Sequence, residues 1–159
     1  MTLTRRTLLA ALAACTAAPT WAAPAQADMI VVFKESRRLY LYQGGEAFRS
    51  YPIGLGWAPE GNKRVEGDGR TPEGSYYINR RNPQSSFHLS LGISYPDPNQ
   101  QAAAVAEGRN PGGEIFIHGG LGNRRQSGDW TAGCIAVSDR DVEEIWQLVP
   151  DGTLIVIQP

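Results

Sequence analysis

The stretch IHGGLGNRRQSGDWTAGCIAVSDRD, residues 117–141, contains a histidine and a cysteine whose spacing is the starting point for predicting the fold and the chemistry of this chain. His118, one of two histidines, comes sixteen residues before Cys134, one of two cysteines. Residues 114–118 predict a strand that ends at the histidine, and residues 135–137 predict a short strand just after the cysteine. Neighbouring strands of one sheet can bring these two side chains together.

A cysteine beside a histidine is the arrangement expected of a nucleophile. The thiolate is the reactive form, and an unperturbed thiol with a pKa of about 8.5 supplies little of it at neutral pH. A histidine within hydrogen-bond reach removes that limit. Gly119, Gly120 and Gly133 would let a substrate backbone approach and leave N–H groups for an oxyanion. Composition alone leaves an alternative open, in which His118 is a hydrogen-bonded structural residue and Cys134 a small buried hydrophobe.

The sequence after Cys134 predicts a helix and a final strand. Ser138 is a suitable N-cap, with Asp141 three residues further on. The apolar residues of this helix recur at the spacing of one face, which we expect to pack on the sheet: Val142, Ile145, Trp146 and Val149. Asp151-Gly152 then predicts a turn before a buried strand at residues 154–157.

The sequence before His118 predicts antiparallel strands separated by turns. Strands are expected at residues 31–33, 39–42, 48–53 and 75–78. Gly44-Gly45 is suited to a hairpin turn, and residues 54–74 predict a loop rich in Gly, Pro and charge. A short connecting helix is expected between its cap, Asp97, and Gly108. The pattern therefore favours a mainly β fold with a helix after the cysteine.

Residues 87–93 alternate between the two faces of a further predicted strand. One face, expected to join the core, carries Phe87, Leu89, Leu91 and Ile93. The other face could line a groove and carries His88, Ser90 and Gly92.

The composition fits one globular domain and gives no reason to expect nucleic acid as a partner. The chain has 159 residues, of which 42% are hydrophobic, and its formal net charge is -1. Its 15 Lys and Arg and 16 Asp and Glu residues are scattered rather than grouped, which is typical of a solvated surface.

Residues 1–27 resemble an export signal peptide, so we expect the folded domain to be 28–159. Arg5 and Arg6 are followed by an apolar run at about residues 8–18, which is too short to span a bilayer core of ~30 Å. The paired arginines also resemble a twin-arginine signal, which implies export after folding, although ordinary signals contain such pairs too.

Two processing sites are compatible with this segment. Ala25-Gln26-Ala27 has the A-x-A form and would release a chain that starts at Asp28. Leu12-Ala13-Ala14-Cys15 resembles a lipobox, which would leave an acylated Cys15 as a lipid anchor. Neither product pairs Cys15 with Cys134, so Cys134 is expected to be a lone, reactive thiol in an exported protein.

The motif His118-Gly119 followed by Thr131-Ala132-Gly133-Cys134-Ile135 resembles the signature of the YkuD-type L,D-transpeptidase catalytic domain. The resemblance extends to residues 71–76 and to the opening hairpin, and so covers nearly the whole chain from about Met29. It implies a β-sandwich-like domain, peptidoglycan stem peptides as substrate, a covalent carbapenem adduct and a location in the periplasm or cell envelope. We expect no metal or other cofactor, because no cluster of metal ligands is evident in the sequence.

The resemblance also implies roles for individual residues. Cys134 is the nucleophile, His118 the base, and the Gly119 carbonyl orients the histidine. Gly133 and the Cys134 N–H are expected to bind the oxyanion. Many members have His where this chain has Ala132 and Arg where it has Ala136, which puts substrate docking and acceptor choice in doubt.

Other candidate substrate contacts each have a structural alternative. Thr131 belongs to the motif itself. His88 either contacts substrate or is a surface histidine with its hydrogen bonds made elsewhere. Arg124 and Arg125 either bind acidic groups of the stem peptide or lie in a solvated loop. Trp130 either forms a wall of the site or anchors its loop.

Three functions are compatible with these residues. In the first, Cys134 attacks the carbonyl of a diaminopimelate residue, forms a thioester and passes the acyl group to an amine. In the second, water accepts the acyl group, and the enzyme is an L,D-carboxypeptidase or endopeptidase. In the third, suggested by Ala132 and Ala136, the domain binds the cell wall without turnover.

Overall fold

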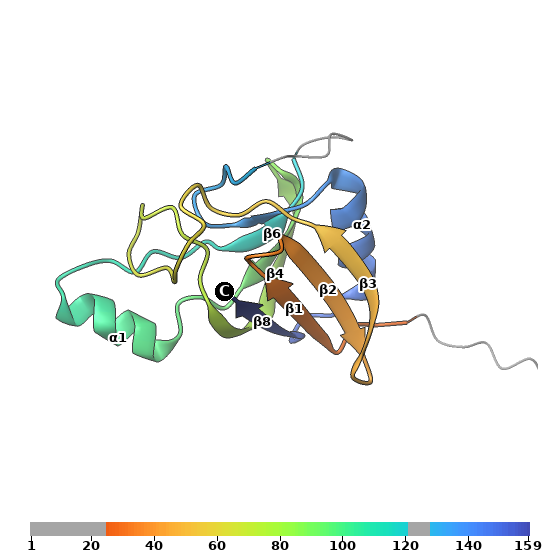
Figure 1. Cartoon of the computed structure of the whole chain (residues 1–159), viewed down its shortest axis with the longest axis horizontal. Coiled ribbons are helices and arrows are strands. Elements are labelled where there is room, and N and C mark those ends of the chain that lie inside the picture. The colour runs from red at the N-terminus through yellow and green to blue at the C-terminus, as the bar shows by residue number, and fades with distance from the viewer. Residues whose placement is uncertain (1–24, 121–127) are drawn as a thin grey trace, which may run out of the picture.

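The computed structural model describes residues 25–120 and 128–159, and across these residues the chain folds mainly into β-structure (Figure 1). The strands are β1 (Met29–Phe33), β2 (Arg38–Gln43), β3 (Glu46–Pro52), β4 (Gly74–Ser85), β5 (His88–Ile93), β6 (Phe116–His118), β7 (Ile135–Ala136) and β8 (Leu154–Gln158). The helices are α1 (Pro98–Ala106) and α2 (Asp139–Leu148). The predicted fold class is confirmed.

The strands form one sheet in the order β3-β2-β1-β8-β4-β5-β6-β7. The long strand β4 joins its two halves, because Gly74–Tyr77 pair with β8 and residues 78–85 pair with β5, both antiparallel. The final strand β8 is central and runs parallel to β1. The sandwich-like arrangement is therefore built from one continuous sheet whose halves share β4.

One apolar cluster holds the two halves of the sheet and α2 together. It contains Ile30, Val32, Leu39, Leu41, Ile155 and Ile157 from one half, Leu91, Ile117 and Ile135 from the other, and Val142 and Ile145 of α2. The predicted face of α2 is confirmed, with Trp146 partly buried beside the fully buried members. Ser138 caps α2 by accepting a hydrogen bond from the Asp141 N–H at 3.1 Å. Figure 1 shows that α1, by contrast, lies to one side of the sheet.

Two expectations for the segments around the sheet are corrected. Phe87 does not join the core: the residue is 43% exposed, because His88 has a φ of 70° and breaks the alternation before β5. The strand that ends at His118 is shorter than predicted, since Glu114 has a φ of 53° and β6 begins only at Phe116.

Ala27 is part of the folded domain. It is 3% exposed, its N–H donates to the Leu148 carbonyl at 2.8 Å, and its carbonyl accepts from Thr153 Oγ1 at 3.4 Å. The ordered chain thus includes a residue that the A-x-A pattern assigns to the signal. Among the described residues, no helix is both long enough and apolar enough to cross a membrane.

Candidate active site

Strands β6 and β7 place His118 and Cys134 on the same face of the sheet. The two strands pair in parallel, with Ile117 opposite Ile135 and His118 opposite Ala136. Cys134 comes two residues before Ala136, so it faces the same side as His118. Strand spacings of about 4.8 Å and rises of about 3.3 Å per residue put the two Cα atoms roughly 8 Å apart. Histidine and cysteine side chains can bridge that separation.

The surroundings of His118 fix its orientation and its tautomer. Its Nδ1 lies 2.8 Å from the Gly119 carbonyl oxygen, and because a carbonyl only accepts, Nδ1 carries the proton and Nε2 keeps a lone pair. The Phe87 ring stacks on the imidazole at 4.5 Å, and Trp130 meets its edge at 5.8 Å. His118 is 3% exposed, and this burial lowers its pKa. The result is a neutral imidazole that is ready to accept a proton at Nε2.

Close packing against α2 explains the glycine after His118. A Cβ on Gly119 would lie 2.7 Å from Asp139 Oδ1 and 2.9 Å from a Val142 methyl carbon. The next residue, Gly120, donates its N–H to the same Asp139 oxygen at 2.6 Å. The carbonyl that orients His118 is therefore held against the first turn of α2.

Thr131 shapes the turn that presents Cys134. Its hydroxyl donates to the Cys134 carbonyl at 2.7 Å and accepts from the Gly133 N–H at 3.1 Å. Gly133 has a φ of 132°, and a Cβ there would lie 2.7 Å from the Arg70 carbonyl oxygen. Because the Gly133 N–H is engaged inside the turn, the Cys134 N–H is left as the candidate oxyanion donor of the two.

The surroundings of Cys134 favour its thiol form. Burial raises the pKa of the Cys134 thiol, while the Phe116 N–H and the charges of Lys63 and Arg80 oppose that rise. Sγ lies 3.5 Å from the Glu114 carbonyl oxygen, an acceptor that suits the S–H form.

Sequence reasoning did not identify Lys63, Arg80 or Glu114. Lys63 is 4% exposed and donates to the Val65 carbonyl at 3.1 Å and to Asp68 Oδ1 at 2.9 Å. The sequence around Lys63 indicates only a loop, and nothing local shows that these groups come near the thiol.

Comparison with known proteins agrees with this geometry. The family model described as the L,D-transpeptidase catalytic domain, YkuD, matches residues 27–157. The chain belongs to this family. The L,D-transpeptidase domain is 32% identical to YafK of Escherichia coli K12, a protein assigned to the L,D-transpeptidases, over 82% of this chain and 50% of YafK.

Solved structures share the fold of this L,D-transpeptidase domain. The helical cell shape determining protein Pgp2 from Campylobacter jejuni matches with a TM-score of 0.63 and 26% identity, over 81% of this chain and 46% of Pgp2. L,D-transpeptidase 1 of Mycobacterium tuberculosis matches with a TM-score of 0.53 and 15% identity, over 82% and 60% of the two chains. A complex of LdtMt1 with imipenem has a TM-score of 0.52 and 16% identity, over 81% and 57%. The chain spans about half the length of YafK and of Pgp2.

The other residues predicted to contact substrate do not all lie beside His118 and Cys134. Trp130 lies against the His118 ring. His88 instead places its Nε2 2.7 Å from Glu143 Oε1 on α2 and is not brought to Cys134 by its strand register. Arg124 and Arg125 lie outside the described residues. Ala132 is exposed, whereas Ala136 is buried and exchanges backbone hydrogen bonds with Gly54.

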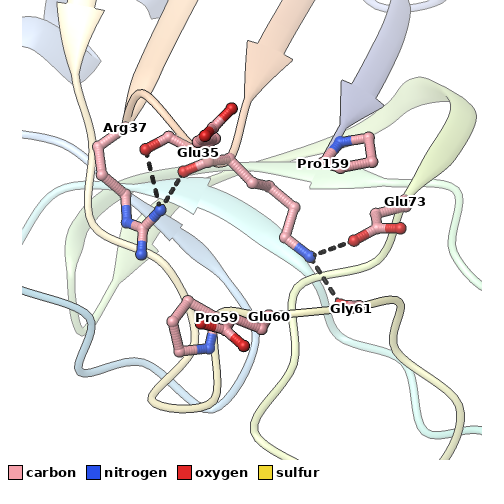
Figure 2. Close-up of a pocket in the computed structure, with 8 residues that line it drawn as sticks. Glu35, Arg37, Pro59, Glu60, Gly61, Glu73 and Pro159 are labelled. Carbon is pink, nitrogen blue, oxygen red and sulfur yellow. Dashed lines mark hydrogen bonds and ion pairs between the residues drawn. The ribbon is translucent and has the colours of Figure 1, made fainter.

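A hollow of about 250 Å³ at the end of β1 lies apart from these residues. Figure 2 shows Arg37 and Glu73 on opposite sides of it. The Lys34 ammonium uses its three donors on the carbonyls of Gly61 and Thr71 and on Glu73 Oε1. Arg37 binds both carboxylate oxygens of Asp129. These cations are engaged within the protein, so they hold loops together. Within residues 25–120 and 128–159, no group of three or more His, Cys, Asp or Glu could hold a metal ion.

Proposed function

We propose that this domain transfers acyl groups of peptidoglycan stem peptides through a thioester on Cys134. The Sγ atom attacks a diaminopimelate carbonyl, the S–C bond forms, the C–N bond to the next residue breaks, and the thiol proton passes through His118 Nε2 to the leaving amine. The observation that carries the proposal is His118, buried, bonded through Nδ1 to the Gly119 carbonyl, and facing the same side of the sheet as Cys134.

The attack starts from a neutral thiol and a neutral imidazole rather than from an ion pair. Burial disfavours both charged forms, since it lowers the pKa of His118 and raises that of Cys134. His118 therefore takes the proton as the S–C bond forms. The Cys134 N–H stabilises the oxyanion.

The acyl acceptor decides between the transferase and the hydrolases. An amine acceptor gives a cross-link, and water gives L,D-carboxypeptidase or endopeptidase activity. The export-like residues 1–27 and the family's association with the cell wall support a location in the periplasm or envelope, with a lipid anchor only if Cys15 is acylated.

The test compares wild-type protein with Cys134→Ala on purified stem peptides, with products identified by mass spectrometry. We expect turnover by the wild type alone, and added amine acceptors separate transfer from hydrolysis. Turnover by Cys134→Ala would refute the thioester.

A carbapenem provides a second measurement, supported by the imipenem complex of LdtMt1. We expect a mass increase on the wild-type protein that Cys134→Ala lacks. A domain that only binds the cell wall would bind stem peptides with neither turnover nor adduct.

A further inference from the structure

Arg80 shares the face of the sheet that carries His118 and Cys134. In the register of the sheet, Arg80 of β4 pairs with Gly92 of β5, and Gly92 pairs with Phe116 of β6. Phe116 comes two residues before His118 on the same strand, so both point to one face. The neighbouring residue, Arg81, points to the other face, where it donates to the Trp146 carbonyl of α2 at 2.7 Å.

Gly92 opens a path for the Arg80 side chain toward β6. A Cβ on Gly92 would lie 2.4 Å from Arg80 Cγ and 2.8 Å from its Nε. Because Gly92 has no side chain, Arg80 crosses it and lays its guanidinium on the Phe116 ring, 4.6 Å from the ring centroid. The guanidinium is thereby directed across the sheet toward β6, on the side where Cys134 lies.

Glu114 links this guanidinium to the nucleophile. Its carboxylate accepts from Arg80 Nη2 at 3.1 Å, and its carbonyl oxygen lies 3.5 Å from Cys134 Sγ. The Glu114 side chain is 82% exposed and that of Arg80 is 38% exposed. An ion pair this exposed contributes little to stability, so an incoming anion can replace the Glu114 carboxylate.

We propose that Arg80 binds a carboxylate of the stem peptide beside the scissile bond, and that the Glu114 carboxylate pairs with this guanidinium until the substrate binds. A guanidinium offers a planar fork that suits a carboxylate in bidentate fashion. Among the described residues, Arg80 donates from Nη2 to Glu114 and, at a long 3.4 Å, from Nη1 to Asn79. The inference rests on the proposed function for its substrate. Two carboxylates are candidates, that of the terminal residue and that of the diaminopimelate side chain.

Binding to the Cys134→Ala protein tests this without requiring turnover. Calorimetry would compare an unmodified stem tetrapeptide with two analogues, one amidated at its C-terminus and one amidated at the diaminopimelate side chain. A charged hydrogen bond is worth roughly 1.5–3 kcal/mol, so adding Arg80→Gln should weaken binding of the unmodified peptide by about 10- to 100-fold. The analogue that lacks the recognised carboxylate should bind weakly already and lose nothing more.

Arg38→Gln is the matched control, since it removes one arginine charge from β2 in the other half of the sheet. Equal effects of Arg80→Gln and Arg38→Gln, or an equal loss on all three peptides, would overturn the proposal. Glu114→Gln should tighten binding of the unmodified peptide. Unchanged affinity would show that Glu114 does not compete with the substrate for Arg80. If Cys134→Ala binds no stem peptide at all, the inference fails. Failure of the proposed function is a separate result: the wild-type protein would neither turn over stem peptide nor form a carbapenem adduct.

Discussion

In the proposed mechanism His118 is the base, and the structure gives it a fixed orientation and a lowered pKa that keeps the imidazole neutral. The bond from Nδ1 to the Gly119 carbonyl presents Nε2, and the rings of Phe87 and Trp130 keep the imidazole out of water. The same packing means that alanine at 118 would leave a cavity as well as remove the base. Glutamine fills more of the space and is the cleaner substitution.

His118→Gln should lower the rate of carbapenem acylation at pH 7 by about 10²- to 10⁴-fold, the usual contribution of an oriented base. The measurement is the time course of adduct formation by mass spectrometry. The matched control is His88→Gln, which changes the other histidine, bonded to Glu143, and should acylate close to the wild-type rate. A wild-type rate in folded His118→Gln would show that the buried histidine is structural.

The pH dependence follows from the directions of the two pKa shifts. In the proposed mechanism His118 acts in its neutral form, and burial lowers its pKa below the usual value of about 6.5. Acylation should therefore stay high from pH 8 down to pH 7 and fall only as the pH drops through the lowered His118 pKa. Rate profiles with a carbapenem would measure this. Thiolate absorbance at pH 7 that disappears in Cys134→Ala would contradict it, because the raised pKa of Cys134 predicts a thiol there.

Ion pairs that join different elements contribute differently to the free energy of unfolding, depending on how buried they are. Lys34, which follows β1, meets Glu73, which precedes β4, at 2.7 Å, with side chains 3% and 20% exposed. Arg49 of β3 meets Glu144 of α2 at the same 2.7 Å, but these side chains are 48% and 42% exposed. The two ion pairs therefore have the same N···O distance but differ in their exposure to water.

Lys34→Ala should lower the free energy of unfolding by about 3 kcal/mol, because it leaves Glu73 and two carbonyls without their partner in a largely dry site. Arg49→Ala should cost far less than Lys34→Ala, since water replaces the lost contact. Urea denaturation of the two variants beside the wild type measures both. Equal losses would show that burial does not govern these pairs.

At the scale of the whole molecule, packing places the start of the folded chain at or before Ala27. Ala27 belongs to the apolar core and bonds to Leu148 and Thr153. Release before Asp28 would remove it. Release after Ala25, where Ala23-Pro24-Ala25 also has the A-x-A form, would keep it.

A protein of residues 28–159 should therefore be less stable than one of residues 26–159 by about 1–2 kcal/mol, from the lost methyl burial and hydrogen bonds. Urea denaturation of the two purified chains gives the difference. The N-terminus of the protein purified from cells, read by mass spectrometry, then shows whether any processing retains Ala27. Equal stability of the two chains would remove the structural reason for retaining it.

Local patterns in the sequence determined the mainly β class, the opening hairpin, both helices with their caps, and the buried face of α2. Each of these depends on periodicity or turn chemistry within about ten residues, which neighbours in sequence are enough to specify. The motif around His118 and Cys134 likewise identified the family, because its residues stand at a fixed spacing.

Tertiary structure alone decided which groups surround the thiol. The positive φ values of His88 and Glu114 interrupt the predicted alternation, turning Phe87 onto His118 and the Glu114 carbonyl toward Cys134. Arg80 reaches the same face only because β4, β5 and β6 align in one register across Gly92. These contacts join residues far apart in sequence, and their energies depend on burial, which no local pattern encodes.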